Sequence, residues 1–160
     1  MFQYLNKEAF DYYLFTYNHD QDYLNIIEKH VSMVVDINNK SDDQIESMLR
    51  EHDLDILIDL SVHIPHNKMN VVNRKLARKT ISYLGFPGSS GSDNYDYIIA
   101  DRIVIPEDKQ NFYTEDVLYL PNIYQVNDGM KKYPNNKSSK DDYSLPEEKI
   151  ILSCFNQSFK

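Results

Sequence analysis

Residues 80–91, TISYLGFPGSSG, join an apolar stretch to a cluster of glycines. The first five of these residues have the β-branched and aromatic composition of a strand. Three of the four glycines in the chain follow, at Gly85, Gly88 and Gly91. In an open α/β sheet, ligands bind beyond the carboxyl ends of the strands, and glycines there let the backbone approach a phosphate or a sugar. The spacing also fits an ordinary tight turn, and it matches neither a Walker loop nor the dinucleotide-binding fingerprint.

Strand-like and helix-like stretches alternate on both sides of this segment. Runs of apolar, β-branched and aromatic residues predict strands at 10–17, 33–37, 54–60, 80–84, 96–100, 117–120 and 149–155. Apolar residues at helical spacing predict helices at 20–29, from residue 41 onward and at 67–77. Ser41 and Gln44 have the spacing of a capping box. The alternation predicts an α/β fold on a parallel sheet, with 54–60 as a central, buried strand.

Composition restricts the class of protein. Twenty-five acidic residues against seventeen Lys and Arg give a net charge of −8, which argues against nucleic-acid binding because phosphates require a basic surface. The apolar runs are too short to span a bilayer, and the N-terminus lacks the features of a signal peptide. Cys154 is the single cysteine, which predicts a buried, unpaired thiol in a reducing compartment. We therefore expect a cytoplasmic protein that acts on neither nucleic acid nor membrane.

Several short motifs, taken in their order along the chain, resemble one enzyme family. The stretch 81–91 (ISYLGFPGSSG) is similar to the Leu-Gly-Tyr-Pro-Gly-Thr-Ser-Gly loop of protein O-GlcNAc transferases, which include Spindly-like proteins and bacterial tetratricopeptide-repeat relatives. The likeness continues at 55–60 (DILIDL), 95–101 (YDYIIAD), 104–106 (VIP), 119–122 (YLPN) and 154–160 (CFNQSFK). It covers nearly the whole chain.

The resemblance implies a glycosyltransferase of the two-Rossmann-domain type (GT-B), in which two Rossmann-like halves with parallel sheets close over a nucleotide sugar. It implies transfer of GlcNAc from UDP-GlcNAc to a Ser or Thr hydroxyl of a protein, without a metal or another cofactor. Relatives that use GDP-fucose or UDP-glucose leave the donor open. The alternative is an inactive remnant or interaction domain with the same fold.

The resemblance also implies how the chain is divided. Residues 1–126 would form most of the N-terminal half, 127–146 a polar linker, and 147–160 the first strand of the nucleotide-binding half. The chain is therefore expected to be truncated at both ends and inactive alone, and a parent chain with tetratricopeptide repeats is left open. Because residues 127–143 have the weakest apolar content, we expect them to be the least ordered internal segment.

The site residues are carried over from the matching motifs. The loop around the donor sugar would consist of Leu84, Gly85, Phe86, Pro87 and Gly88, which would act by shape and backbone contact. The terminal lysine, Lys160, would contact the diphosphate of the donor and stabilise charge on the leaving nucleotide. Gln157 would bond to the base or to a phosphate.

His63 would line the same site. A histidine after a strand is a candidate general base, because imidazole can take up a proton near neutral pH, although it also fits an ordinary exposed loop residue. The sequence departs from the family here. Val62 and Ile64 stand where the family has Gly and Thr, and Phe86 replaces a tyrosine. The histidines also lack the spacing of metal ligands, so no metal site is expected.

Overall fold

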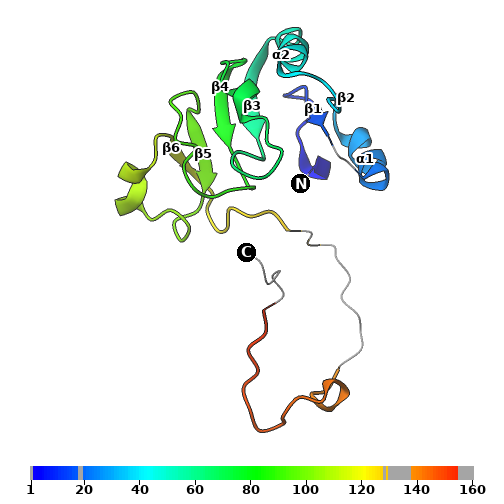
Figure 1. Cartoon of the computed structure of the whole chain (residues 1–160), viewed down its shortest axis with the longest axis vertical. Helices are drawn as coiled ribbons and strands as arrows, with labels where there is room; N and C mark the ends of the chain where they lie inside the picture. The colour runs from blue at the N-terminus through cyan, green and yellow to red at the C-terminus, as the bar shows by residue number, and fades with distance from the viewer. Residues whose placement is uncertain (1, 18–19, 128, 130–137, 155–160) are drawn as a thin grey trace. The chain divides into compact units, whose positions relative to one another are not determined.

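The computed structural model describes residues 2–17, 20–127, 129 and 138–154. The chain forms two compact units, Met1–Asp128 and Gly129–Lys160. All strands in the described part of the chain belong to the first unit (Figure 1). In the second unit, the described residues contain one 3₁₀ turn, Asp141–Tyr143.

Six parallel strands form two sheets. In the first sheet, β1 (Tyr13–Thr16) pairs with β2 (Met33–Asp36). The second sheet has the order β3 (Leu54–Asp59), β4 (Ala77–Ser82), β5 (Tyr97–Ala100) and β6 (Asp116–Tyr119). The connections contain α1 (Gln21–Ile27), α2 (Asp42–Arg50), α3 (Met69–Val72) and the 3₁₀ helix η3 (Glu107–Phe112). The predicted α/β fold with Rossmann-like parallel sheets is confirmed.

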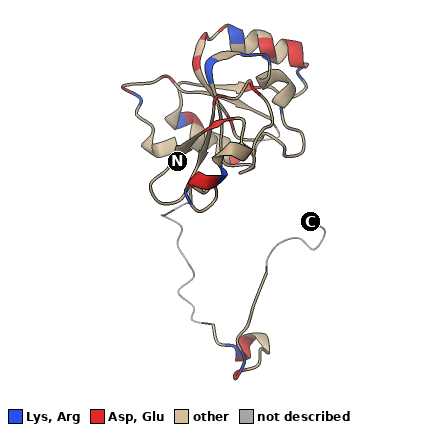
Figure 2. Ribbon diagram, turned by 90° about the vertical axis from the view of Figure 1, so that its left-hand side faces the viewer, with Lys and Arg blue, Asp and Glu red and all other residues tan. Residues whose placement is uncertain are grey.

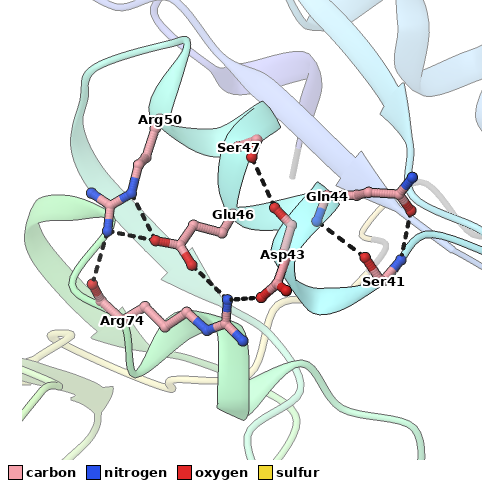
Figure 3. Close-up of polar contacts among 7 residues, drawn as sticks. All are labelled: Ser41, Asp43, Gln44, Glu46, Ser47, Arg50 and Arg74. Carbon is pink, nitrogen blue, oxygen red and sulfur yellow. Dashed lines mark hydrogen bonds and ion pairs between the residues drawn. The ribbon is translucent and has the colours of Figure 1, made fainter.

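Helix α2 begins with the capping box that its sequence predicts. The Ser41 hydroxyl accepts a bond from the backbone N–H of Gln44 at 3.3 Å, and the Gln44 side-chain oxygen accepts one from the Ser41 N–H at 2.9 Å (Figure 3). These bonds satisfy N–H groups that have no partner within the helix. On the inner side of the helix, Ile45 and Leu49 are buried.

The outer side of α2 carries charged residues (Figure 2) and is tied to the chain that follows α3. Arg74 Nη1 lies 2.7 Å from an oxygen of Asp43 and 2.5 Å from an oxygen of Glu46 (Figure 3). The hydrogen bond from Arg74, together with one from Arg50, holds the pKa of the Glu46 carboxyl below its usual value. The network therefore links α2 to the segment that leads into β4.

The two faces of the four-stranded sheet differ. The strand register and the alternation of side chains place one set of residues on a face that we call the covered face: Leu57, Thr80, Ser82, Ile98, Ala100 and Val117. Its hydrophobic members pack against residues of the connecting segments, such as Val72 and Ile105. The other set forms what we call the open face: Ile56, Ile58, Ile81, Tyr97, Ile99 and Leu118.

Strand β3 corrects one prediction. Residues 54–60 were expected to form a central, buried strand, but β3 lies at the edge of the four-stranded sheet. Ile56 and Ile58 are each 48% exposed. Within the described residues, the connections of this sheet pack on the covered face, so the other side of β3 keeps its solvent exposure.

Two further elements differ from expectation. The helix predicted at 67–77 is limited to α3, because the backbone of Lys75 adopts a positive φ of 54° and the chain enters β4 at Ala77. The strand predicted at 149–155 is absent from residues 149–154, and Cys154 is exposed rather than buried. A strand requires a neighbouring strand to take up its backbone hydrogen bonds. The described residues of the second unit contain no strand that could pair with residues 149–154. Residue 155 lies outside the described residues.

Candidate functional site

Two loops meet at the carboxyl edge of the four-stranded sheet. His63 follows β3, and the glycine-rich segment Gly85–Gly91 follows β4. The Nε2 atom of His63 lies 3.1 Å from the carbonyl oxygen of Ser89. Its ring also packs edge-on against Phe86, with 5.1 Å between ring centroids. The predicted placement of the glycine-rich segment at this edge, next to His63, is confirmed.

The contact with Ser89 defines the state of the His63 ring. A carbonyl oxygen can only accept a hydrogen bond, so Nε2 must carry the proton in this arrangement. In the neutral ring, the Nδ1 atom is then the nitrogen that can accept a proton. His63 is an exposed residue. The ring is therefore held through Nε2 by the glycine-rich segment, and Nδ1 is the acceptor atom of the neutral ring.

The chain turns sharply where β4 leads into the glycine-rich segment. The N–H of Gly85 donates to the carbonyl of Tyr83 at 2.9 Å, across Leu84, whose φ is +71°. This is a γ-turn with a positive φ at its centre, a rare and strained conformation for a leucine. A β-carbon on residue 85 would overlap the carbonyl oxygen of Leu60. Glycine is therefore required at residue 85, where the two loops approach each other.

The ring of Phe86 lies over the backbone of Gly88. A β-carbon on Gly88 would overlap the Phe86 ring, so a larger residue would displace it. Phe86 is 40% exposed, and Gly85 and Pro87 are exposed as well. The carbonyl of Pro87 accepts a hydrogen bond from the hydroxyl of Tyr113 at 3.2 Å. The loop thus presents backbone and one aromatic ring at the surface.

A buried carboxylate, Asp59, orders the loop after β3. One oxygen accepts the N–H groups of Ser61 at 2.8 Å and Val62 at 3.3 Å, and the other accepts the hydroxyl of Tyr95 at 2.6 Å. Burial, together with the hydrogen bond to Asp59, raises the pKa of Tyr95 well above its usual value. The phenol therefore remains a donor, and Asp59 holds the segment that leads to His63.

Val62 is strained within this loop. Its φ is +41°, a conformation in which a β-branched residue is an outlier. The side chain is fully buried and packs with Val72 and Tyr95. This is the position at which the sequence departs from the glycine of the O-GlcNAc transferase motif. The backbone thus has a glycine-like conformation where valine replaces glycine.

A second buried carboxylate, Glu115, holds the far end of the glycine-rich segment. Its Oε1 accepts the N–H of Ser90 at 2.6 Å, and its Oε2 accepts the hydroxyls of Ser89 at 2.8 Å and Thr114 at 3.1 Å. Burial acts to raise the pKa of the Glu115 carboxyl, but the hydrogen bonds from Ser90 and Ser89 outweigh it, and the pKa falls below its usual value. Glu115 therefore remains a charged anchor for this loop.

Sequence reasoning missed these two anchors. Both carboxylates interrupt or border apolar runs, Asp59 in LDILIDL and Glu115 directly before DVLYL. An acid in such a place is seldom buried without partners, which is the signal that could have identified them. Their partners lie elsewhere in the chain: Tyr95 for Asp59, and Ser89 and Ser90 for Glu115.

The structure describes part of the predicted site. It brings His63 together with Phe86 and with the backbone around it, while Gln157 and Lys160 lie outside the described residues. Among the residues that the structure describes, no group of three or more His, Cys, Asp and Glu side chains is placed to hold a metal ion. None of the helices in this described part is long and apolar enough to cross a membrane.

Comparison with known proteins identifies the family. The sequence profile of glycosyl transferase family 41 matches residues 3–140. The chain belongs to glycosyl transferase family 41. The resemblance seen in the motifs is therefore confirmed.

Relatives within family 41 are much longer than this chain. The probable UDP-N-acetylglucosamine–peptide N-acetylglucosaminyltransferase SEC of Arabidopsis thaliana is 32% identical over 160 residues, which cover 97% of this chain and 16% of the relative. The corresponding SPINDLY protein of Eustoma exaltatum is 31% identical over 86 residues, which cover 54% of this chain and 9% of the relative.

A solved structure shares the fold. A mutant of the O-GlcNAc transferase of Thermobaculum terrenum superposes with a TM-score of 0.72 at 20% identity, and the match covers 77% of this chain and 24% of that one. This similarity supports the expected relation to the GT-B fold. The chain thus spans less than a quarter of the length of the two curated relatives and about a quarter of the solved one.

Proposed function

We propose that this chain forms the donor-sugar side of a glycosyltransferase site that uses UDP-GlcNAc and transfers GlcNAc to a Ser or Thr hydroxyl of a protein. The main support is the contact of His63 with the glycine-rich segment at the carboxyl edge of the sheet. That edge is where ligands bind in open α/β folds. The names of the relatives in family 41, which specify UDP-N-acetylglucosamine and peptide, support the donor and the acceptor.

In this proposal, each part of the described site has a physical task. The backbone at Gly85 and Gly88 and the ring of Phe86 form a surface against which a sugar ring can lie. Glu115 and Asp59 hold the two loops in place, so that little ordering remains to be done when the donor binds. Nδ1 of His63 accepts a proton or a hydrogen bond at the rim. Lys160 and Gln157 would contact diphosphate and nucleotide, and the reaction would need no metal or other cofactor.

The four glycines allow a direct test. A sample labelled with ¹⁵N-glycine gives one backbone signal for each glycine, three from Gly85, Gly88 and Gly91 and one from Gly129 in the other compact unit. With UDP-GlcNAc at about 10 mM, we expect the signals of Gly85 and Gly88 to shift and that of Gly129 to stay. We expect affinity for UDP alone to be weaker than about 1 mM, or less than about 4 kcal/mol.

Matched variants separate loop shape from nonspecific effects. Gly85→Ala should abolish the sugar-induced shift of Gly88, because the added methyl collides with the Leu60 carbonyl. Phe86→Tyr, which restores the hydroxyl of the family motif, should keep the sugar-induced shift of Gly88. Equal shifts at Gly85 and Gly129, or no shift up to about 50 mM donor, would contradict the proposal. That second result would favour the inactive remnant or interaction domain. Competition with GDP-fucose and UDP-glucose tests the choice of donor.

A further inference from the structure

After β6, the chain turns back across the carboxyl edge of the four-stranded sheet. Residues 121–127, which we call the strap, run past the ends of β5 and β4 (Figure 1). They form no helix or strand, and all are exposed except Tyr124, which is half-buried. Two side chains from the ends of β4 and β5 bond to the backbone of Tyr124. The strap is therefore attached to the sheet at Tyr124.

Buried side chains hold both the N–H and the carbonyl of Tyr124. Asp101 directly follows β5, and its Oδ2 accepts the N–H of Tyr124 at 2.8 Å, while its Oδ1 accepts two N–H groups of its own loop at 2.9 Å. Tyr83 directly follows β4, and its hydroxyl donates to the carbonyl of Tyr124 at 2.8 Å. Backbone hydrogen bonds hold the pKa of Asp101 below its usual value. Burial raises the pKa of Tyr83, so its hydroxyl remains a donor.

The backbone of Tyr83 leads into the strained turn that opens the glycine-rich segment. Its N–H donates to the carbonyl of Asp59 at 3.0 Å, and its own carbonyl accepts the N–H of Gly85 at 2.9 Å. The second bond closes the turn over Leu84, whose φ is +71°. A strained conformation persists only where its surroundings hold it. Tyr83 is fixed at its N–H, its carbonyl and its hydroxyl, directly beside the strained residue.

Loss of the strap would disturb this arrangement. Without the carbonyl of Tyr124, the hydroxyl of Tyr83 would be a buried donor without a partner, which is costly. The ring would move to reach water, and the carbonyl that closes the turn over Leu84 would move with it. A loop that spends only a fraction of its time in the binding conformation binds its ligand more weakly by that fraction.

We propose that Tyr83 is a positioning residue for the glycine-rich segment and that the strap fixes it through Tyr124. This inference rests on the proposed function, in which the segment binds the donor sugar. Asp101 serves the same purpose from β5, because it holds the strap. The strap leads into the polar stretch 127–143, so the shape of the sugar-binding loop depends on the path by which the chain leaves the first unit.

Two substitutions release the strap from different sides. Tyr83→Phe removes the hydroxyl, and Asp101→Asn replaces one carboxylate oxygen by an NH₂ group that cannot accept a hydrogen bond. In the full chain labelled with ¹⁵N, each should speed amide hydrogen exchange at Tyr124 about tenfold or more. Each should also move the signal of Gly85. The effect of Asp101→Asn on Gly85 is the decisive one, because the bonds of Asp101 are to the strap and to its own loop.

Tyr119→Phe is the matched control. The hydroxyl of Tyr119 donates to the carbonyl of Ile105 at 2.9 Å, so this variant also loses a bond from a tyrosine to a backbone carbonyl. It should leave exchange at Tyr124 and the signal of Gly85 unchanged. Circular dichroism shows whether each variant is folded, and either folded variant of the strap contacts suffices for the test.

Donor binding gives the functional result. The affinity for UDP-GlcNAc, measured from the shift of the Gly88 signal, should fall about fivefold in Tyr83→Phe and in Asp101→Asn. In Tyr119→Phe it should stay within about twofold of the original value. A residue with a purely structural role would speed exchange at Tyr124 and leave this affinity unchanged.

Three results would overturn the proposal. The first is an unchanged Gly85 signal in folded Asp101→Asn, since the strap would then not act on the loop. The second is faster exchange at Tyr124 with unchanged affinity for the donor. The third is an equal effect of Tyr119→Phe. Absence of donor binding in the original chain would instead contradict the proposed function, and the Gly85 signal and the exchange at Tyr124 would still test the link between strap and loop.

Discussion

At the scale of single residues, two buried carboxylates hold the loops at the carboxyl edge of the four-stranded sheet. Asp59 and Glu115 are each buried and each accept three hydrogen bonds from neighbouring loops. Bonds to a charged acceptor are stronger than bonds between neutral groups. Val62 destabilises the loop that Asp59 orders, because its φ of +41° is a strained conformation for valine.

The strain at Val62 predicts that the glycine variant at this position is at least as stable as the alanine variant, the reverse of their usual order of stability. Val62→Ala removes buried methyl groups and should lower the free energy of unfolding by about 2 kcal/mol. Val62→Gly removes one more carbon but relieves the strain, so this variant should be at least as stable as Val62→Ala. In α3, where the conformation is helical, Val72→Gly should be less stable than Val72→Ala by about 1 kcal/mol. Urea denaturation measures all four, and the same order at both positions would refute the assignment of strain.

The lowered pKa of Glu115 predicts how stability depends on pH. Because the folded pKa lies below the usual 4.5, the ionised anchor stabilises the fold above that pH, and the contribution is lost as the pH falls through the folded value. Glu115→Gln should lower the free energy of unfolding by about 2 kcal/mol at neutral pH, with a smaller difference below about pH 4.

The matched control for this substitution is Glu107→Gln, whose carboxylate pairs with Arg102 at the surface. It should change the free energy of unfolding by about 0.5 kcal/mol or less. Urea denaturation at several pH values gives both results. A difference between Glu115→Gln and the original chain that stays constant from neutral to acid pH would contradict the role of the charge.

At the scale of elements, local signals were predictable, and the long-range arrangement was predictable only in part. The start of α2 followed from Ser41 and Gln44, because both partners of the capping box lie within one turn. The position of the glycine-rich segment beside His63 followed from the rule that parallel strands share a carboxyl edge. The exposure of β3 did not follow, because its apolar residues say nothing about which face the connections cover. The partners of Asp59 and Glu115 required the tertiary structure.

The capping box makes a quantitative prediction for α2. Ser41→Ala leaves an N–H in the first turn without its bond and should lower the free energy of unfolding by about 1 kcal/mol. Ser47 lies within the same helix, and its hydroxyl donates a hydrogen bond to the carbonyl of Asp43. Ser47→Ala should therefore change stability by about 0.5 kcal/mol or less. Comparison of their urea midpoints checks the prediction, and equal effects would show that the box contributes nothing specific.

At the scale of the whole molecule, the division into two compact units separates the parallel sheets from the remaining chain. The first unit carries the glycine-rich segment and the open face. The polar stretch 127–143 extends from the end of the first unit into the second. Its composition gives little apolar area to bury.

Limited digestion with trypsin tests this division. The stretch 127–143 and the stretch 74–79 (RKLARK) each contain four lysines or arginines. The second stretch leads into and belongs to β4, where backbone hydrogen bonds protect the chain. We expect the first cuts within 127–143, identified by mass spectrometry of early products. Earlier cutting at 74–79 would place the boundary elsewhere.

The order of the strands also affects how the sheet assembles as the chain is synthesised. Leu54 pairs with Ala77, Ile81 with Tyr97, and Tyr97 with Asp116, so each strand finds its neighbour within about two dozen positions. Closing such short loops costs little entropy, and no strand waits for a partner made much later. On a ribosome that adds about 5–20 residues per second, the whole of β4 is made before β5 begins. We therefore expect the sheet to grow in chain order, with each new strand added to the edge formed by the strand before it.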